Sequence, residues 1–262
     1  MGKATGKTAI ITGGGTGLGR ALTTLLAKEG YSVAVIARSE EPLRDVCAEV
    51  VEQGGRAFYR SCDITDAEAL RVSVHELVGE LDGRLDLMII NAGMIGFSKQ
   101  ERLPSEKMRQ VLQTNIMGSV ASLHAVIPQM AQQGFGQIVG ISSLGAFFRW
   151  PVGGLSYYYT SKRCMSLLLG TYRRHLRVHG ISVSIMHPGW IETAMVPKAE
   201  SGKMSEYLDT PESAARKIMN GVEAKKDLIF PWPLFIQIQR RNLFLFFRTL
   251  LQKGLRMGKR SA

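Results

Sequence analysis

Short apolar runs alternate with longer amphipathic segments along most of the chain. The runs are rich in Val, Ile and Leu and are mostly apolar, as expected of strands that are buried on both sides of a sheet. The segments between them carry apolar residues at helical spacing, and one of them, LGRALTTLLAKEG, ends on a glycine of the kind that terminates helices. The runs predicted as strands are residues 7–12, 31–37, 57–63, 85–91, 136–142, 181–189 and 227–230.

This alternation predicts one doubly wound α/β domain. Repeated strand–helix units need crossover connections, which place helices on both faces of a mostly parallel sheet, here of seven strands. No Pro- or Ser-rich linker interrupts residues 7–231, and no repeat of solenoid period is present. We therefore predict that residues 1–231 form a single domain and that residues 232–262 form a C-terminal helical extension.

The composition is that of an ordinary globular protein. Of the 262 residues, 45% are hydrophobic and 21% are charged, which is enough apolar material for a sizeable core. The three cysteines (Cys47, Cys62 and Cys164) lie far apart without metal-ligand spacing, so we expect reduced thiols and a cytoplasmic location. The N-terminal residues carry no long apolar stretch, so we expect no secretion signal.

The first predicted strand leads directly into the glycine-rich stretch TGGGTGLG and then into a predicted helix. Glycines such as Gly13, Gly17 and Gly19 are needed where φ is positive or where the main chain closely approaches a ligand. The N–H groups and the dipole at the start of the helix suit a pyrophosphate. A purely structural turn would look similar, but the position after the first strand of an alternating chain favours a nucleotide site.

Six motifs in this order resemble those of the short-chain dehydrogenase/reductase family. They are TGGGTGLG, NAG at 91–93, Asn115, a serine at the end of the fifth strand, Tyr-x-x-x-Lys, and HPG at 187–189. The resemblance covers residues 7–231 and implies a Rossmann-like fold and a dinucleotide-dependent oxidoreductase. It implies cofactor contacts at Gly13, Thr16, Gly17, Leu18, Gly19, Asn91, Ala92, Gly93, Pro188, Gly189, Ile191 and Thr193.

The end of the second predicted strand bears on the choice of cofactor. An acidic residue here would accept hydrogen bonds from the ribose of NAD, but Ala37 stands in this place, and Arg38 and Ser39 follow. A guanidinium can pair with a 2′-phosphate, so we predict NADP(H) rather than NAD(H). The alternative is that Arg38 is only a solvated surface charge. The resemblance further places Asp63 and Ile64 against the adenine.

The stretch SYYYTSK, residues 156–162, contains three consecutive tyrosines and a lysine. On a helix, Tyr158 and Lys162 lie one turn apart on one face, whereas Tyr157 and Tyr159 point away by roughly 100° each and are packing or pocket residues. A free phenol has a pKa of about 10, and a nearby cation lowers it. Given the resemblance, we predict that Tyr158 is the general acid and base. Lys162 is predicted to lower its pKa and to bind the nicotinamide ribose. The alternative is a chance pair on an amphipathic helix.

Other catalytic candidates come from the resemblance. It implies that the second serine of the pair 142–143, Ser143, polarises the substrate carbonyl, and that Asn115 holds a water of the proton relay. Ser143 and Tyr158 are farther apart in the sequence than is common in the family, which indicates an altered loop beside the substrate pocket. The histidines, His187 among them, show no ligand spacing with acids or cysteines, so we predict no metal site.

The tail differs from the rest of the chain in charge. The net charge is +11, and after Asp227 there are seven basic residues and no acidic one. On a helical wheel an apolar face opposes a basic face, with Ile238 and Leu245 outside the pattern. The longest apolar run, LFLFF, is far shorter than the roughly 20 residues that span a bilayer. The apolar face comprises Ile236, Leu243, Phe247, Leu250 and Leu251, and the opposite face comprises Arg241, Arg248, Gln252 and Arg256.

Such a tail is typical of a helix that lies on an anionic membrane, with Trp232 as an anchor at headgroup depth. We therefore predict peripheral membrane contact through residues 232–262 at the inner, cytoplasmic membrane surface. The alternative is a helix that covers the substrate pocket or forms a subunit interface. Phe and Leu are too frequent for a phosphate-tracking surface, so we predict no nucleic-acid partner.

Together these observations predict an NADP(H)-dependent enzyme. We expect it to interconvert a ketone or aldehyde and an alcohol on a small, apolar, lipid-like substrate. A narrower alternative is a 3-ketolipid reductase of the ketosphinganine or ketoacyl type. An alternative of another class is a catalytically silent nucleotide-sensing module or a membrane adaptor, although Asn115, Ser143, Tyr158 and Lys162 are all present. The resemblance also implies a homodimer or homotetramer.

Overall fold

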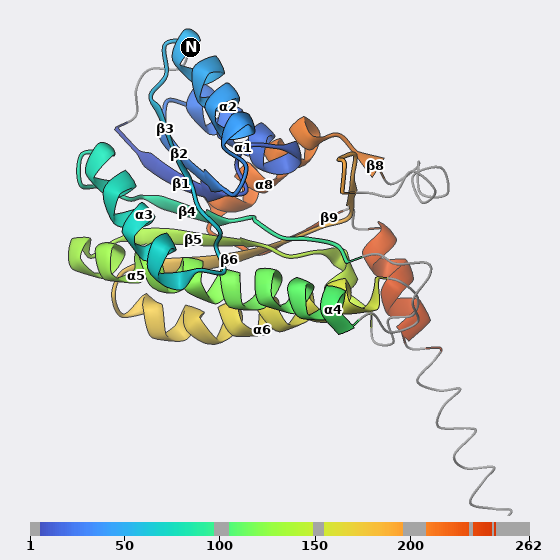
Figure 1. Cartoon of the computed structure of the whole chain (residues 1–262). Coiled ribbons are helices and arrows are strands. Elements are labelled where there is room, and N and C mark those ends of the chain that lie inside the picture. Colours follow the sequence, from blue (N-terminus) through green and yellow to red (C-terminus); the bar gives the residue numbers. More distant parts are fainter. Residues whose placement is uncertain are drawn as a thin grey trace, which may run out of the picture.

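A central parallel sheet organises the protein, as the computed structural model in Figure 1 shows. The structure describes residues 6–96, 105–148, 155–195, 208–230, 233–242 and 244. Seven strands form the sheet in the order β3-β2-β1-β4-β5-β6-β9, and every neighbouring pair is parallel. The strands are β1 (Thr8–Thr12), β2 (Ser32–Ala37), β3 (Ala57–Ser61), β4 (Leu87–Ile90), β5 (Gly136–Ile141), β6 (Ile181–Pro188) and β9 (Leu228–Phe230). The predicted fold class is confirmed, and each of the predicted strands is present.

Helices cover both faces of this sheet (Figure 1). One face carries α1 (Gly17–Lys28), α2 (Glu40–Glu52) and α8 (Pro211–Ala224). The other carries α3 (Ala67–Glu80), α5 (Ser119–Gln133) and α6 (Ser156–Arg177). The shorter elements are α4 (Ser105–Leu112), a π-helix (Gln113–Gly118) that joins α4 to α5, a 3₁₀ helix (Leu144–Phe147) after β5, and a last helix at 233–242.

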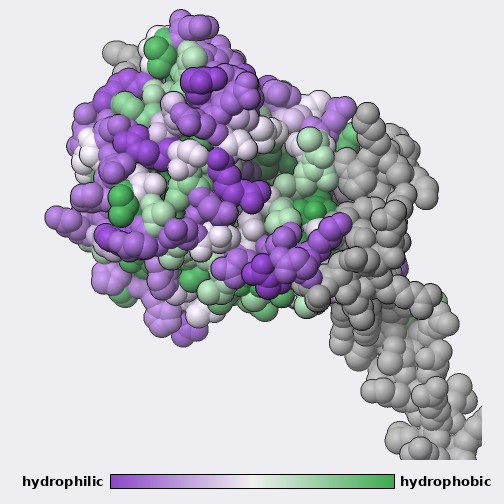
Figure 2. All heavy atoms as spheres, in the orientation of Figure 1, coloured by the Kyte–Doolittle hydropathy of each residue, from purple (hydrophilic) through white to green (hydrophobic). Residues whose placement is uncertain are grey.

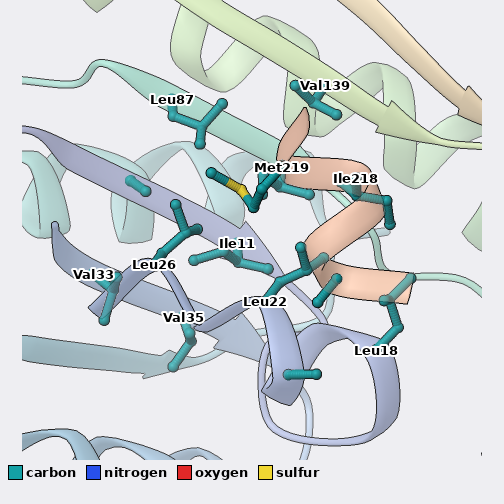
Figure 3. Close-up of a cluster of buried hydrophobic side chains, with 14 of the residues drawn as sticks. Ile11, Leu18, Leu22, Leu26, Val33, Val35, Leu87, Val139, Ile218 and Met219 are labelled. Atoms are coloured by element: carbon teal, nitrogen blue, oxygen red, sulfur yellow. The ribbon is translucent and has the colours of Figure 1, made fainter. Parts of the chain in front are cut away.

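Each central strand contributes to two separate cores, because successive side chains point to opposite faces of the sheet. Ile11 packs with Leu22, Leu26 and Val35 in the cluster between the sheet and α1 (Figure 3). Its neighbour Ile10 belongs to the cluster on the opposite face, and both isoleucines are fully buried. Truncation of such a side chain to alanine costs roughly 2–5 kcal/mol of stability. The sheet is therefore held rigidly from both sides.

The strand order reverses direction between β1 and β4. The chain runs outward from β1 to β2 and β3, then returns to the other side of β1 with β4 and continues outward to β9. Because all strands are parallel, their carboxyl ends meet at one edge, and a crevice forms outside those ends at the reversal point. The loops at this edge carry the sequence motifs described above.

Two short strands were not predicted. β7 (Trp190–Ile191) and β8 (Leu208–Asp209) form a separate parallel pair beside the end of β6. Strands of two residues carry no periodicity that a sequence pattern could reveal. Within the described residues, no helix combines the length and the apolar character that crossing a membrane would require.

Candidate active site

A cleft of about 460 Å³ opens at the carboxyl edge of the sheet. The loops after β1, β2, β3, β4, β5 and β6 contribute to its walls, together with Tyr158, Tyr159 and Lys162 of α6. In Figure 2, apolar side chains gather around a hollow on a face that is otherwise mostly hydrophilic. Every residue predicted to bind the cofactor or to act in catalysis lines this cleft, with the exception of Asn115.

The turn between β1 and α1 forms one wall. Gly13 and Gly17 have positive φ angles of 69° and 51°, which glycine adopts without steric cost. At Gly19 a Cβ atom would overlap the carbonyl oxygen of Gly13, so only glycine lets the turn lie this close to α1. Thr16, the N-cap residue of α1, makes no side-chain cap hydrogen bond. The start of α1 thus presents uncapped N–H groups and the positive end of the helix dipole, which suit a pyrophosphate.

Hydrogen bonds join the ends of β1 and β4 at the reversal point. Asn91 Nδ2 donates to the carbonyl oxygens of Thr12 at 3.0 Å and of Gly13 at 3.2 Å. Thr12 Oγ1 in turn accepts hydrogen bonds from the backbone N–H groups of Asn91 at 3.1 Å and of Ala92 at 3.2 Å. These four bonds fix the glycine turn against the loop after β4.

Arg38 lies at the rim of the cleft, where β2 ends. Its side chain is 71% exposed and its guanidinium is 3.9 Å from a carboxylate oxygen of Asp63, so this ion pair is loose and contributes little to stability. The other oxygen of Asp63 accepts hydrogen bonds from the N–H and the hydroxyl of Thr65, both at 2.9 Å. Ile64 is buried in close contact with Gly118. Arg38 can therefore pair with an anion at the rim, while Ile64 offers an apolar surface beside it.

Tyr158 lies in the first turn of α6, where its hydroxyl forms a hydrogen bond with Ser143. Ser143 precedes the 3₁₀ helix, and its Oγ accepts a hydrogen bond from the N–H of Gly145 at 3.1 Å. Burial raises the pKa of Tyr158 to about 12, and the bond to Ser143 acts in the opposite direction. In this structure burial outweighs the bond to Ser143, so the pKa of Tyr158 lies above its ordinary value, and the predicted lowering of this pKa by Lys162 stays a prediction. Tyr158 keeps its proton at neutral pH.

Lys162 lies one turn farther along α6 and is almost fully buried. Its Nζ donates to the carbonyl oxygen of Ile141 at 2.8 Å and lies 5.9 Å from the centroid of the Tyr158 ring. Burial lowers the pKa of Lys162 to about 8. A Cβ atom on Gly93 would lie 3.2 Å from both Lys162 Nζ and Asn115 Oδ1, so the glycine leaves room for these two groups.

Asn115 lies in the π-helix, fully buried behind the wall of the cleft. Its Oδ1 accepts a hydrogen bond from Met94 N–H at 2.8 Å, and its Nδ2 donates to the Met94 carbonyl at 3.0 Å and to Ser161 Oγ at 2.9 Å. The amide thus joins the segment after β4 to α6. Short π-helical turns often occur at functional sites, but neither this one nor the contact with Ser161 was predicted from the sequence.

The side chains beside the Tyr158–Ser143 pair have structural contacts. Tyr159 lines the cleft and stacks on Phe148, with ring centroids 5.2 Å apart, whereas Tyr157 is not among the lining residues. Ser142 Oγ donates to the carbonyl oxygen of Lys162 at 3.1 Å, which ties β5 to α6. The predicted division of roles between Ser143 and Tyr158 and their neighbours stays a prediction.

His187 is buried at the end of β6, and burial lowers its pKa to about 4, so the ring is neutral at physiological pH. It packs against Phe147, with ring centroids 4.8 Å apart. In the part of the chain that the structure describes, no three His, Cys, Asp or Glu side chains gather where they could hold a metal ion.

The helix at 233–242 contributes two lining residues that the sequence reasoning missed, Leu234 and Ile238. Ile238 is 4% exposed, although it fell outside the predicted apolar face. The predicted face is therefore wrong for this part of the tail, because the side chains that turn toward the body of the protein follow the register of Leu234 and Ile238. Trp232, Leu243, Leu245, Phe247, Arg248, Leu250, Leu251, Gln252 and Arg256, which were named in the tail predictions, lie outside the described residues.

A doubly wound α/β protein with a glycine turn at the reversal point and a Tyr–Lys pair with a buried lysine beside it has the site of a dinucleotide-dependent oxidoreductase. The model of the short chain dehydrogenase family matches residues 7–203. The chain belongs to this family of oxidoreductases, and the resemblance drawn from the motifs is confirmed.

Similar proteins cover most of the chain. The 3-oxoacyl-(acyl-carrier-protein) reductase FabG of Staphylococcus aureus is 31% identical over 211 residues, which are 80% of this chain and 84% of FabG. A short chain dehydrogenase from Burkholderia cenocepacia in complex with NADP is 28% identical, with a TM-score of 0.75, over 86% of this chain and 96% of that one. A 7α-hydroxysteroid dehydrogenase complexed with NADH and 7-oxo glycochenodeoxycholic acid is 27% identical, with a TM-score of 0.78, over 86% of this chain and 92% of that one.

Proposed function

We propose that the protein is an NADP(H)-dependent oxidoreductase that interconverts a ketone or aldehyde and an alcohol on a small apolar molecule. The observation that carries this proposal is the group in the cleft, where the Tyr158 hydroxyl is hydrogen-bonded to Ser143 and the Nζ of the buried Lys162 lies 5.9 Å from the centroid of the Tyr158 ring. A catalytically silent module would need none of these contacts, and neither would a membrane adaptor.

The shape of the cleft supports a dinucleotide. The glycine turn and the uncapped start of α1 would hold the pyrophosphate, and Asp63 and Ile64 would hold the adenine. Thr193 lies close enough to Gly17 that a Cβ atom there would be 3.0 Å from the threonine methyl group, so this residue borders the same turn. The residues that would hold the cofactor are Gly13, Thr16, Gly17, Leu18, Gly19, Arg38, Ser39, Asp63, Ile64, Asn91, Ala92, Gly93, Tyr158, Lys162, Pro188, Gly189, Ile191 and Thr193.

The preference for NADP(H) rests on Arg38. Similar proteins have been solved both with NADP and with NADH, so the preference must come from this chain's own residues. The loose pairing of Arg38 with Asp63 leaves the guanidinium able to bind a 2′-phosphate. Ala37, which precedes it in the wall of the cleft, offers no carboxylate to a ribose hydroxyl.

The residues of the chain divide the work of carbonyl reduction. When bound, the cofactor supplies the hydride. Tyr158 gives its phenolic proton to the substrate oxygen, and Ser143 donates a hydrogen bond to the same oxygen. Lys162, held by the Ile141 carbonyl, stabilises the phenolate that remains. Asn115 positions this machinery through Met94 and Ser161, so we assign it a positioning role in the proposed relay.

The substrate is proposed to be apolar because aromatic and aliphatic residues surround the catalytic pair. Phe148, Leu155, Tyr159 and Trp190 all line the cleft. A 3-ketolipid reductase remains the narrower version of this proposal, and the similarity to a 3-oxoacyl reductase supports it.

Three further proposals concern organisation. Residues 1–231 would form the catalytic domain and residues 232–262 an extension, with a membrane contact confined to the part beyond the packed helix. A homodimer or homotetramer is supported by exposed apolar side chains on the outer surface of the molecule at the α5–α6 side. An example is Leu167 of α6, which is 68% exposed. A cytoplasmic location is supported by the three cysteines, which are all free thiols.

The experiment that tests the proposal is the substitution Tyr158→Phe. This change removes the proton donor and preserves the ring, so NADPH-dependent reduction of an apolar ketone should fall by roughly a hundredfold or more. The matched control is Tyr157→Phe, which lies next to it on α6 but outside the wall of the cleft. If Tyr158→Phe retains full turnover, or if Tyr157→Phe abolishes it, the proposed assignment must be abandoned.

A further inference from the structure

The helix at 233–242 is fastened to the segment that follows Ser143. Asn242 Nδ2 donates to the Phe147 carbonyl oxygen at 2.7 Å, and the Phe235 ring meets the Phe147 ring edge-on at a centroid distance of 5.0 Å. The Arg241 guanidinium lies 6.0 Å from the centroid of Phe148. Three contacts from two turns of helix hold it against the wall of the cleft.

One stripe of this helix faces the cleft. Leu234, Ile238 and Asn242 are spaced four residues apart and therefore lie along one face. Leu234 and Ile238 line the cleft, and Asn242 makes the bond to Phe147. Arg240 and Arg241 are exposed. The helix thus turns its apolar side to the cleft and leaves its charges in solvent.

A row of aromatic rings connects this stripe to the proposed proton donor. The Tyr158 and Tyr159 ring centroids are 5.9 Å apart, and Tyr159 stacks on Phe148 at 5.2 Å. Phe148 in turn lies under Arg241 of the helix, and its chain neighbour Phe147 accepts the hydrogen bond from Asn242 of the stripe. The rings therefore form a continuous apolar surface that leads away from the Tyr158 hydroxyl toward the C-terminal helix.

Charge along the cleft is distributed unevenly. Among the described lining residues the charged side chains are Arg38, Asp63 and Lys162. Arg38 and Asp63 pair at the rim by β2, and Lys162 is buried with its Nζ on the Ile141 carbonyl. None of the three lies on the helix that carries Leu234 and Ile238, and the exposed Arg241 of that helix lies over the Phe148 ring, outside the lining residues. An uncharged apolar arm fits this end of the cleft best.

We propose that the helix at 233–242 forms the subsite for the apolar arm of the substrate, and that Leu234 and Ile238 set how strongly a long arm is preferred over a short one. This inference rests on the proposed carbonyl reduction and deepens it, because it names a neutral substrate with an extended aliphatic or alicyclic arm. The arm runs from the carbonyl at Tyr158 along Tyr159 and Phe148 to the helix.

The test compares two methyl ketones, butanone and methyl nonyl ketone, as substrates of the full-length protein with saturating NADPH. The wild type should have a much lower KM for the long ketone. Leu234→Ala and Ile238→Ala should each raise that KM by roughly tenfold, since removing hydrophobic contacts from a pocket costs about this much discrimination. The KM for butanone, kcat for either ketone and the dissociation constant of NADPH should change little.

A third variant and a control guard against indirect effects. Ile238→Trp places a larger side chain in the cleft. It should raise the KM for methyl nonyl ketone and leave the KM for butanone unchanged. Arg240→Ala lies on the exposed side of the same helix and should resemble the wild type. Thermal melting of each variant shows whether the helix still packs, and Leu234→Ala, at a partly exposed position, is the change that disturbs packing least.

Binding without turnover separates this inference from the proposed function. Quenching of tryptophan fluorescence by methyl nonyl ketone reports occupancy directly, since Trp190 lines the cleft. If the wild type reduces neither ketone but binds the long one, and Leu234→Ala weakens that binding, the subsite stands and the proposed function fails. If the wild type reduces both ketones equally well, or if the variants keep its preference, the subsite is overturned. Absence of any binding by the long ketone overturns it as well.

Discussion

Arg38 is the residue on which the cofactor proposal turns. The acids Glu40 and Glu41 stand close by in the first turn of α2, but neither lines the cleft, and Glu40 accepts a hydrogen bond from the Tyr59 hydroxyl at 3.3 Å. Arg38→Ala should therefore weaken NADPH binding by roughly 1.5–3 kcal/mol, the contribution of a hydrogen bond to a charged group, and should leave NADH binding almost unchanged. Titration of both cofactors by calorimetry measures the two effects.

Arg44→Ala provides the matched control for this substitution. Arg44 is an exposed residue of α2 outside the wall of the cleft, so its removal changes the net charge equally without removing the proposed contact. Equal losses for NADPH and NADH in Arg38→Ala would show that the arginine is structural, and a loss in Arg44→Ala would indicate a general effect of surface charge.

Lys162 sets the expected pH dependence of reduction. Burial lowers its pKa to about 8, so the amine is charged below that pH and neutral above it, while Tyr158 stays protonated until about pH 12. If the charged amine stabilises the phenolate, kcat for ketone reduction should be constant near pH 7 and should fall about tenfold per pH unit above roughly pH 8. A pH–rate profile under saturating substrate and cofactor measures this.

The charge of Lys162 can be tested separately from its position. Lys162→Arg keeps a charge throughout this pH range, so whatever activity it retains should not fall above pH 8. A wild-type profile that is flat to about pH 10 would contradict the role given to the amine. A fall that persists in Lys162→Arg would assign the titration to another group.

At the scale of elements, the sequence predicted the strands and helices that are long enough to leave a hydrophobic pattern. Five strands of the main sheet, β1, β2, β4, β5 and β6, are buried on both faces and therefore read as apolar runs. The edge strands β3 and β9 are only partly buried and were predicted from their place in the strand–helix alternation. Asn115 was singled out by its motif, but its π-helical turn was not predicted, because the change from α- to π-spacing leaves no mark on the hydrophobic period. The pair β7 and β8 was missed for lack of length.

The C-terminal helix shows why a helical wheel alone does not predict which face of a short helix is buried. The wheel drawn over the whole tail chose one apolar face for residues 232–262, whereas the described helix buries Ile238 and bonds Asn242 to Phe147. Which face of a short helix is buried depends on the surface it meets, and that surface is made by residues far away in the sequence. Hydrophobic periodicity alone could not supply this information.

At the scale of the whole molecule, the site is assembled from both ends of the chain. The motif residues from Gly13 to Thr193 could be placed around one cleft from the sequence because the carboxyl ends of parallel strands meet at one edge of the sheet. Leu234 and Ile238 reach the same cleft only because β9, the last strand of the sheet, ends at Phe230 beside β6. Likewise, the raised pKa of Tyr158 follows from burial, which a motif cannot show.

The packing of the C-terminal helix also narrows the membrane proposal. Leu234 and Ile238 line the cleft, so their side chains are not available to a membrane. A membrane contact would have to come from residues after Asn242, of which Phe244 is 66% exposed. That segment carries Arg248, Lys253, Arg256, Lys259 and Arg260. Each basic residue near an anionic surface contributes about 1 kcal/mol, so the intact protein should sediment with vesicles that contain phosphatidylserine and much less with neutral ones.

A chain that ends at Asn242 gives the sharpest comparison, because it keeps the packed helix and the wall of the cleft. This shortened protein should melt at the same temperature as the intact one and stay in the supernatant with either kind of vesicle. High salt should release part of the intact protein, since screening weakens the attraction of the basic residues. A truncation before residue 233 would be a poor substitute, because it strips Ile238 and Asn242 from their partners and exposes apolar surface. If the intact protein stays in the supernatant with anionic vesicles at low salt, or if the chain ending at Asn242 sediments equally well, residues 243–262 do not form the membrane contact.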